Sequence, residues 1–475
     1  MKKVLTLHLG SSYLDIMRNN LLFILLLICC VSIAQAQDSI GATMQNGLHI
    51  VQNENCWGTY KAERGFFQKA YSDPSNPRFM MTNEDETFSF GIGGVVHFTT
   101  FEDFNGSVNA TGFSTFDIAS PTRYANHFGM SMTNSKINFK ASSKLGNHNL
   151  IAFCELSAIG DNGIELKKVY VSYDGLSVGK TYSFFMDLAA GVQTVDLQGP
   201  NTQIDNVHPL IGYTLPIGNR WEVAMAAEIS KSPISDIYEQ YVNVEFQSMP
   251  DFTAHIKLHD DWGHLQLSGV YRRLHYRSVN LQVVGNDASS NEIGFGAALS
   301  GKVNLGSRTF VTFQGVYGRG IAQYIADLAG AEVDLVAQSW TDDNIYKATF
   351  DPGWANNLDQ KVPFGCTQLT TLPVYGGYFS VQHQFNQKFF ASITYGCVAT
   401  SSRGSVYDQY SLYLTTVPTY KSSQYVAANL FYNIDQYTMV GIEYLYGERH
   451  NYASLTDPSP QGHANRIDAM LIYTF

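Results

Sequence analysis

The chain has 475 residues, a formal net charge of -11, 13% aromatic residues and only 15% charged residues, while its mean hydropathy is slightly negative at -0.12. Soluble proteins carry about 25% charged residues, and no stretch after the N-terminal region reaches the roughly 18 apolar residues of a membrane-spanning helix. An ordinary soluble domain and a helical membrane protein are therefore both disfavoured. The acidic balance also excludes a strongly basic nucleic-acid-binding protein.

The N-terminal region has the pattern of a secretory signal peptide. The apolar stretch 21–33 is too short to span a bilayer, and residues 34–36 (Ala-Gln-Ala) fit an A-x-A cleavage site. We therefore predict a signal peptide at residues 1–36, with Met17 as an alternative start. Residues 37–86 are polar and aperiodic, and we predict that they form a periplasmic segment.

From residue 87 onward, apolar and polar residues alternate with the period of a β-strand in one segment after another. The predicted strands are 87–99, 129–141, 149–157, 165–173, 176–183, 208–215, 221–229, 252–258, 264–276, 292–303, 309–317, 374–385, 389–398, 425–432, 437–446 and 465–475. Short turns alternate with long connections, apart from one short connection at 159–163. This organisation predicts an all-β, sixteen-stranded antiparallel transmembrane barrel at residues 87–475, with short periplasmic turns and long external loops.

The last predicted strand has one apolar face, with Ile467, Ala469 and Leu471, and one mostly polar face, with Arg466 and Asp468. It ends on an aromatic residue. We expect it to pair with the first strand and leave no open edge. Aromatic residues near strand ends predict two interfacial girdles; they are Phe98, Phe101, Tyr173, Trp221, Tyr276, Tyr317, Phe385, Phe389, Tyr444, Tyr446, Tyr473 and Phe475.

Strand parity places five cations in the lumen: Lys168, Lys257, Arg272, Lys302 and Arg466. A cation on the lipid face would cost about 2–4 kcal/mol at mid-membrane, so the inward face is expected for each. Carboxylates share this face, including Glu155, Glu222, Glu228, Glu292, Glu443 and Asp468. The pattern predicts a polar lumen of mixed charge, and it leaves the sign of ion selectivity open.

Patterns that suggest chemistry have simpler explanations. The G-x-S-x-G match at 175–179 crosses a hairpin, whereas a nucleophile elbow leads into a helix. His255 and His259 flank Lys257, without a further ligand that would complete a metal site. The acidic residues Asp327, Glu332, Asp334, Asp342 and Asp343 would fit a divalent cation or, more simply, a solvated loop. We expect no enzyme activity, metal or cofactor. The sequence leaves open whether Cys56 and Cys366 form a disulfide.

Several motifs resemble the DcaP-like family of dicarboxylic-acid porins. They are residues 84–96, residues 178–187 followed by Gly199-Pro200-Asn201, residues 317–320, and residues 443–449 followed by 464–475. Lys180 and Tyr182 depart from the family pattern, where Gln and Trp are expected, and the N-terminal segment shows no coiled-coil heptads. The resemblance implies a homotrimeric outer-membrane porin for small hydrophilic solutes, including anionic ones.

Residues 184–206 form the third long connection. Because a third loop narrows the pore in trimeric porins, we expect this loop to fold inward. It carries Asp187, Asp196 and Asn201, together with Gln198, Gln203 and Asp205. Our hypothesis is that the loop faces Lys168, Lys257 and Arg272 across the lumen and creates a transverse electric field. With Lys302 and Arg466, these residues form the predicted pore lining.

Two other functions fit parts of the sequence. Residues 318–372 form a connection long enough for a surface adhesin or glycan-binding loop. An outer-membrane protease or phospholipase would need a catalytic set at the rim of a smaller barrel. A receptor with an internal plug and 22 strands is disfavoured, because barrels of about that size need a longer chain.

Overall fold

The computed structural model describes residues 49–52, 79–83, 87–104, 112–122, 126–160, 163–231, 242–244, 247–278, 290–331, 333–337, 369–402, 419–435, 437–453 and 460–475. The predicted signal peptide and the Cys56–Cys366 pair lie outside these residues. Among the described residues, no helix is both long and apolar enough to cross a membrane.

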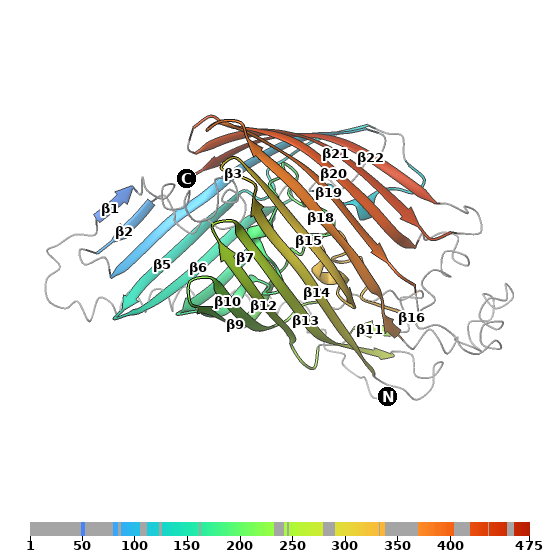
Figure 1. The fold of residues 1–475 in the computed structure, drawn as a ribbon, viewed down its shortest axis with the longest axis horizontal. Coiled ribbons are helices and arrows are strands. Elements are labelled where there is room, and N and C mark those ends of the chain that lie inside the picture. The colour runs from blue at the N-terminus through green and yellow to red at the C-terminus, as the bar shows by residue number, and fades with distance from the viewer. Residues whose placement is uncertain are drawn as a thin grey trace, which may run out of the picture.

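Sixteen of the described strands close into an antiparallel barrel (Figure 1). They are β3 (Phe88–Phe104), β5 (Lys136–Leu145), β6 (His148–Ile159), β7 (Gly163–Tyr173), β8 (Leu176–Tyr182), β9 (Val207–Ile217), β10 (Trp221–Glu228), β12 (Asp251–Asp260), β13 (Gly263–Ser278), β14 (Ser290–Asn304), β15 (Thr309–Arg319), β18 (Pro373–Gln384), β19 (Phe389–Thr400), β20 (Tyr420–Asn433), β21 (Thr438–Asn451) and β22 (Gln461–Thr474). Each predicted strand corresponds to one of them, so the predicted all-β barrel and its strand number are confirmed.

The barrel closes between its last and first strands. β22 pairs with β3 from Asn465↔Phe104 to Thr474↔Val95. The seam continues to the last residue, because Gly94 and Phe475 exchange backbone hydrogen bonds of 2.8 and 3.0 Å. Closure removes the unpaired edge that a lipid environment would not tolerate.

The two faces of the wall differ as the alternation predicts. Outward side chains such as Ile211, Leu267 and Ile393 are 57–59% exposed, as is expected of an apolar belt against lipid. Tyr173, Trp221, Tyr317, Phe389 and Tyr473 are also exposed near strand ends. Two of the predicted girdle residues face the interior instead: Phe101 and Tyr276 are each only 4% exposed.

Four short strands extend the sheet beyond the barrel: β1 (His49–Gln52), β2 (Phe79–Thr82), β4 (His127–Ser131) and β11 (Val242–Val244). β1 and β2 belong to the segment that we predicted to be aperiodic, and β2 pairs with the start of β3 (Figure 1). The single strand predicted at 129–141 is divided into β4 and β5. Asn134 lies between them with a left-handed φ of 66°, which interrupts an extended strand.

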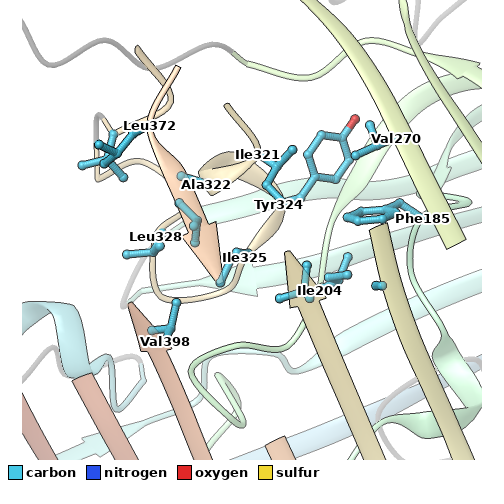
Figure 2. Packing of buried hydrophobic residues seen from close by; sticks show 14 of the residues in the cluster. Phe185, Ile204, Val270, Ile321, Ala322, Tyr324, Ile325, Leu328, Leu372 and Val398 are labelled. Carbon is cyan, nitrogen blue, oxygen red and sulfur yellow. The ribbon is translucent and has the colours of Figure 1, made fainter. Parts of the chain in front are cut away.

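The largest hydrophobic cluster lies inside the barrel, between two inward-folded loops and the wall (Figure 2). One loop, residues 183–206, includes the 3-10 helix η3 (Leu188–Ala190). The other, residues 320–337, includes η4 (Ala322–Tyr324) and the strand β16 (Leu335–Ala337), which pairs with β17 (Leu369–Thr371). We call them the first and second inward loops. A third segment, at residues 112–122, carries η2 (Thr115–Asp117) and packs on β20 and β21.

Candidate pore constriction and vestibule

The first inward loop spans the lumen between opposite walls. At one end, Ser183 Oγ donates a 2.7 Å hydrogen bond to Glu228 on β10. At the other, Tyr378 Oη on β18 donates to Ala190 O at 2.9 Å, and the backbone N–H of Asp196 donates to Glu443 Oε1 on β21 at 2.8 Å. Side chains of the wall thus satisfy backbone groups that would otherwise be buried without partners.

Asp187 is the charged contact of this loop with β12 and β13. Its carboxylate lies 3.4 Å from Lys257 Nζ and 2.8 Å from His264 Nε2, and it accepts a 2.7 Å hydrogen bond from Ser300. Burial alone would raise the pKa of Asp187, but the bond to His264 and the charge of Lys257 outweigh it, so the pKa lies below its ordinary value. Asp187 is therefore ionised at neutral pH and fixes the loop to the wall.

Asp196 and Asn201 lie within the packing of the loops. Asp196, 5% exposed, accepts a 2.8 Å hydrogen bond from the backbone N–H of Phe113 in the third segment. Asn201, fully buried, donates to Ser423 Oγ on β20 at 3.1 Å. The structure places both residues in contacts that hold the loops together, away from the water-accessible surface where we predicted them.

The second inward loop packs directly against the first. Ile204 and Ile325 form an antiparallel bridge, and the backbone N–H of Ala326 donates to Gln203 O at 2.8 Å. Figure 2 shows Tyr324 beside Phe185, and these two rings meet edge to face at 5.6 Å. Both side chains are fully buried. The described part of the long connection 318–372 therefore folds into the barrel, which weakens the surface-adhesin alternative; residues 338–368 lie outside the described residues.

Asp327 joins the two loops and the third segment. Its carboxyl accepts hydrogen bonds from the backbone N–H of Thr115 at 2.7 Å and from Gln198 Nε2 at 2.9 Å. Burial raises the pKa of Asp327 to about 7, and the neighbouring Asp196 charge acts in the same direction. The contact thus depends on a carboxyl group whose charge changes near neutral pH.

Four of the five predicted lumen cations are paired with carboxylates. Lys168 lies 3.4 Å from Glu155, and Lys257 lies 3.4 Å from Asp187. The fully buried Arg272 contacts Asp251 at 3.0 Å and Asp334 of the second loop at 2.7 Å. Arg466 binds Asp103 across the closing seam with hydrogen bonds of 2.6 and 3.1 Å.

These pairings change the predicted transverse field. Of the three cations proposed to face the first loop, Lys257 forms an ion pair with it. Arg272 is held by the second loop and the wall, since it also donates to Gly320 O at 2.6 Å and Ser230 Oγ at 2.8 Å. Lys168 lies over the rings of Phe153 and Tyr182 at 5.4 and 4.6 Å.

The short-turn end of the barrel contains a cavity of about 1330 Å³, which we call the vestibule. The turns β12–β13 and β14–β15 contribute to its rim, and Met186 and Leu188 of the first loop belong to its lining. Its basic side chains are Lys140, Lys168, Lys257, Lys302, Arg308, His255, His259 and His264, and its carboxylates are Glu222, Asp260 and Asp261. The fold thus brings together three of the five predicted cations, but neither Arg272 nor Arg466.

Sequence reasoning missed Lys136, Lys140 and Arg308. Lys136 and Lys140 share a face of β5, and Lys136 Nζ lies 3.8 Å from Glu155. Both lysines have inward parity in the predicted strand 129–141, so the same alternation argument would have placed them in the lumen. Near them lies Asp205 of the first loop, which is exposed and close enough to Lys167, Lys136 and Lys168 for their charges to act on its carboxyl group.

The residues weighed for metal binding are engaged elsewhere. His255 contacts Phe184 O at 2.8 Å and Glu222 at 3.3 Å. Asp327 and Asp334 hold the inward loops through separate partners. Within the described residues no group of histidine, cysteine and carboxylate side chains has a metal-binding arrangement; Glu332, Asp342 and Asp343 lie outside them.

A closed barrel of sixteen strands, with an apolar outer belt and a polar lumen entered by loops, defines a porin of the bacterial outer membrane. Comparison with known families agrees: the model of the Porin subfamily matches residues 88–461. The chain belongs to this family.

One solved structure shows the same fold, and two others match less closely. The outer-membrane channel DcaP of Acinetobacter baumannii matches with a TM-score of 0.64 and 14% identity, over 83% of this chain and 99% of that chain. OmpF of Salmonella typhi, solved with daunomycin, matches with a TM-score of 0.47 and 9% identity, over 82% and 99% of the two chains. The trimer form of OmpT from Vibrio cholerae has a TM-score of 0.46 and 10% identity, over 82% and 100%. A comparison with curated proteins gave no match.

Proposed function

We propose that this porin allows passive diffusion of small hydrophilic solutes and favours anionic, dicarboxylate-like ones. The observation that carries the proposal is the charge of the vestibule, whose described lining includes five lysine or arginine side chains and three carboxylates. A lumen lined by an excess of one charge raises the local concentration of oppositely charged solutes. The function is transport, and neither catalysis nor a cofactor is part of it.

In this proposal the first inward loop is the constriction, in agreement with the sequence hypothesis for residues 184–206. Asp187 and Lys257 fix one part of the loop to the wall. Asp205, on the loop, lies near the lysines of β5 and β7, and in this proposal these side chains border the passage between loop and wall. In this proposal the transverse electric field lies between Asp205 and Lys136, and Arg272 is no longer part of it.

The test is the reversal potential of the purified porin in a planar bilayer that separates two concentrations of KCl. Anion selectivity is expected, and it should weaken when Lys136 and Lys140 are both replaced by Gln. Lys144→Gln is the matched control, since Lys144 is an exposed lysine of the same strand near its turn. A cation-selective reversal would remove the anionic preference, and a protein without conductance would remove transport itself.

The proposal includes a homotrimer, as the family resemblance implies, with the outer face of β7 and β8 inside the interface. Lys180 pairs in register with Val169 and Pro209, and it has the outward parity of Leu176 and Val178. It lies about 10 Å along the barrel axis from the short turn, from the rise per residue and strand tilt. A lysine facing lipid there would cost about 2–4 kcal/mol, whereas a second copy of the chain would cover it.

Lys180→Glu tests this interface, because three like charges would meet or approach at the trimer contact. We expect a lower trimer fraction for this variant on semi-native gels and in chemical crosslinking. Lys144→Glu makes the same charge change at an exposed position near the turn and should leave the trimer intact. An unchanged trimer in Lys180→Glu would place the interface elsewhere.

A further inference from the structure

Lys302 differs from the other lumen cations that we predicted. Lys168, Lys257, Arg272 and Arg466 each have a carboxylate partner within the protein. Within the described residues, the Lys302 ammonium contacts the ring of Phe310, whose centroid lies 3.9 Å from Nζ. A partly buried cation without a counter-ion is costly. In a membrane channel such a group points to a functional site, because it is free to pair with a solute.

The surroundings of Lys302 give this site a defined shape. Lys302 lies on β14, in register with His264 of β13 and Thr312 of β15. Phe310 lies on β15, two residues before Thr312, and its ring covers one side of the ammonium. The same hairpin also contributes Asn304, Gly306, Ser307, Arg308 and Thr309 to the lining. The hairpin thus presents a fixed cation, a second cation at the rim and an amide to one cavity.

Three of the acidic groups nearby already have partners, and the remaining lining carboxylate, Asp261, is an exposed residue of the β12–β13 turn. Asp187 is compensated by Lys257 and His264. Asp260 lies 3.1 Å from Arg220, and Glu222 lies 3.3 Å from His255. These pairings leave the positive charge of the β14–β15 hairpin directed at the solvent of the vestibule.

We propose that Lys302, with Arg308 at the rim, is an oxyanion-binding subsite on the periplasmic side of the constriction. The occupant is a small solute that carries a carboxylate or phosphate group. A cation donating to an oxyanion forms a charge-assisted hydrogen bond, about twice as strong as a neutral one, and the guanidinium of Arg308 adds a planar donor fork suited to two oxygens. A solute that has passed the first loop would pause at this position before release.

This inference deepens the proposed anion preference, and it is tested separately from it. The current through the purified wild-type porin is measured in KCl while succinate, or inorganic phosphate, is added to each side of the bilayer. We expect a concentration-dependent block, and Lys302→Gln should raise the half-blocking concentration about tenfold, the effect of losing one charge-assisted hydrogen bond. Lys302→Arg should keep the block, and Lys144→Gln, outside the vestibule, should match the wild type.

The two solutes distinguish the source of the oxyanion. Block by succinate alone assigns the subsite to carboxylates, and block by phosphate alone assigns it to phosphates. Heat-modifiable gel mobility shows that each variant has folded. An unaltered block in Lys302→Gln, or no block of the wild type by either solute, would overturn the subsite. A cation-selective reversal potential would instead overturn the anion preference and leave a Lys302-dependent block standing.

Discussion

Ile204 and Ile325 form an antiparallel bridge between two loops that are 121 positions apart in the chain and meet inside the barrel. Their side chains are each at most 1% exposed and belong to the main hydrophobic cluster (Figure 2). Burying a large aliphatic side chain stabilises by about 1.5–3 kcal/mol. The second inward loop therefore supports the first, and the lumen is narrowed by a two-loop unit.

A disulfide at this bridge should form without changing the channel. In the variant Ile204→Cys with Ile325→Cys, we expect oxidation to link the loops, because antiparallel neighbours lie within disulfide distance. Peptide mapping would identify the bond. Single-channel conductance should be the same in oxidised and reduced protein. A pair that stays reduced, or a conductance that falls on oxidation, would show that the loops separate in the working channel.

Shortening the first inward loop should widen the passage. Replacing residues 189–199 by a short Gly-Ser linker removes the part that contacts Tyr378 and Asn429 on the far wall. We expect a higher single-channel conductance and weaker ion selectivity, since fewer charges border a wider pore. Heat-modifiable mobility would show that the barrel still closes. Unchanged conductance in a folded variant would mean that residues 184–206 are not the constriction.

Contact between the inward loops should weaken as the pH rises. Because burial raises the pKa of Asp327 from 3.8 to about 7, the packed state holds a proton that the released state gives up above about pH 4. The free energy that stabilises the contact between the loops should therefore decrease from about pH 4 to about pH 7, by about 1.4 kcal/mol per pH unit at most. Above pH 7 it should change no further. Hydrogen exchange of residues 321–331, corrected for intrinsic rates, measures this.

Asp327→Asn is the matched control for that pH dependence. The amide keeps the size of the side chain and one acceptor for Thr115, but it does not titrate. In this variant, the pH dependence of hydrogen exchange should be smaller by the contribution of the single proton that Asp327 binds. Asp196 and Arg466 lie in the same charged network and remain in the variant. An identical pH profile in both proteins would assign the titration to Asp196, whose pKa burial also raises.

The wall of the barrel was predictable and its contents were not. Alternation is local, so each strand leaves a two-residue period that residues such as Ile467 and Arg466 display without knowledge of the fold. The partners of the lumen charges are distant in sequence: Asp187 and Lys257 are separated by 70 positions, and Arg272 and Asp334 by 62. Their pairing depends on how loops pack inside the barrel, and for that reason Lys302 could not be distinguished from the other four cations.

Arg466 should be essential for the closing seam. Its guanidinium binds Asp103 of β3 at 2.6 Å, lies 4.3 Å from the centroid of the Phe101 ring, and is 2% exposed. Arg466→Met keeps the bulk but leaves the fully buried Asp103 with an uncompensated charge, and removing one partner of a buried pair costs about 3–5 kcal/mol. Urea unfolding in detergent, followed by gel mobility, should show a matching loss.

The double variant Arg466→Met with Asp103→Leu separates charge from shape. It removes both members of the pair and replaces them with apolar groups, so most of the lost stability should return. If the single variant is as stable as the wild type, His127, 3.6 Å from Asp103, compensates that carboxylate. If the double variant stays as unstable as the single one, the seam depends on the two hydrogen bonds themselves, and strand β22 is held to β3 by their geometry.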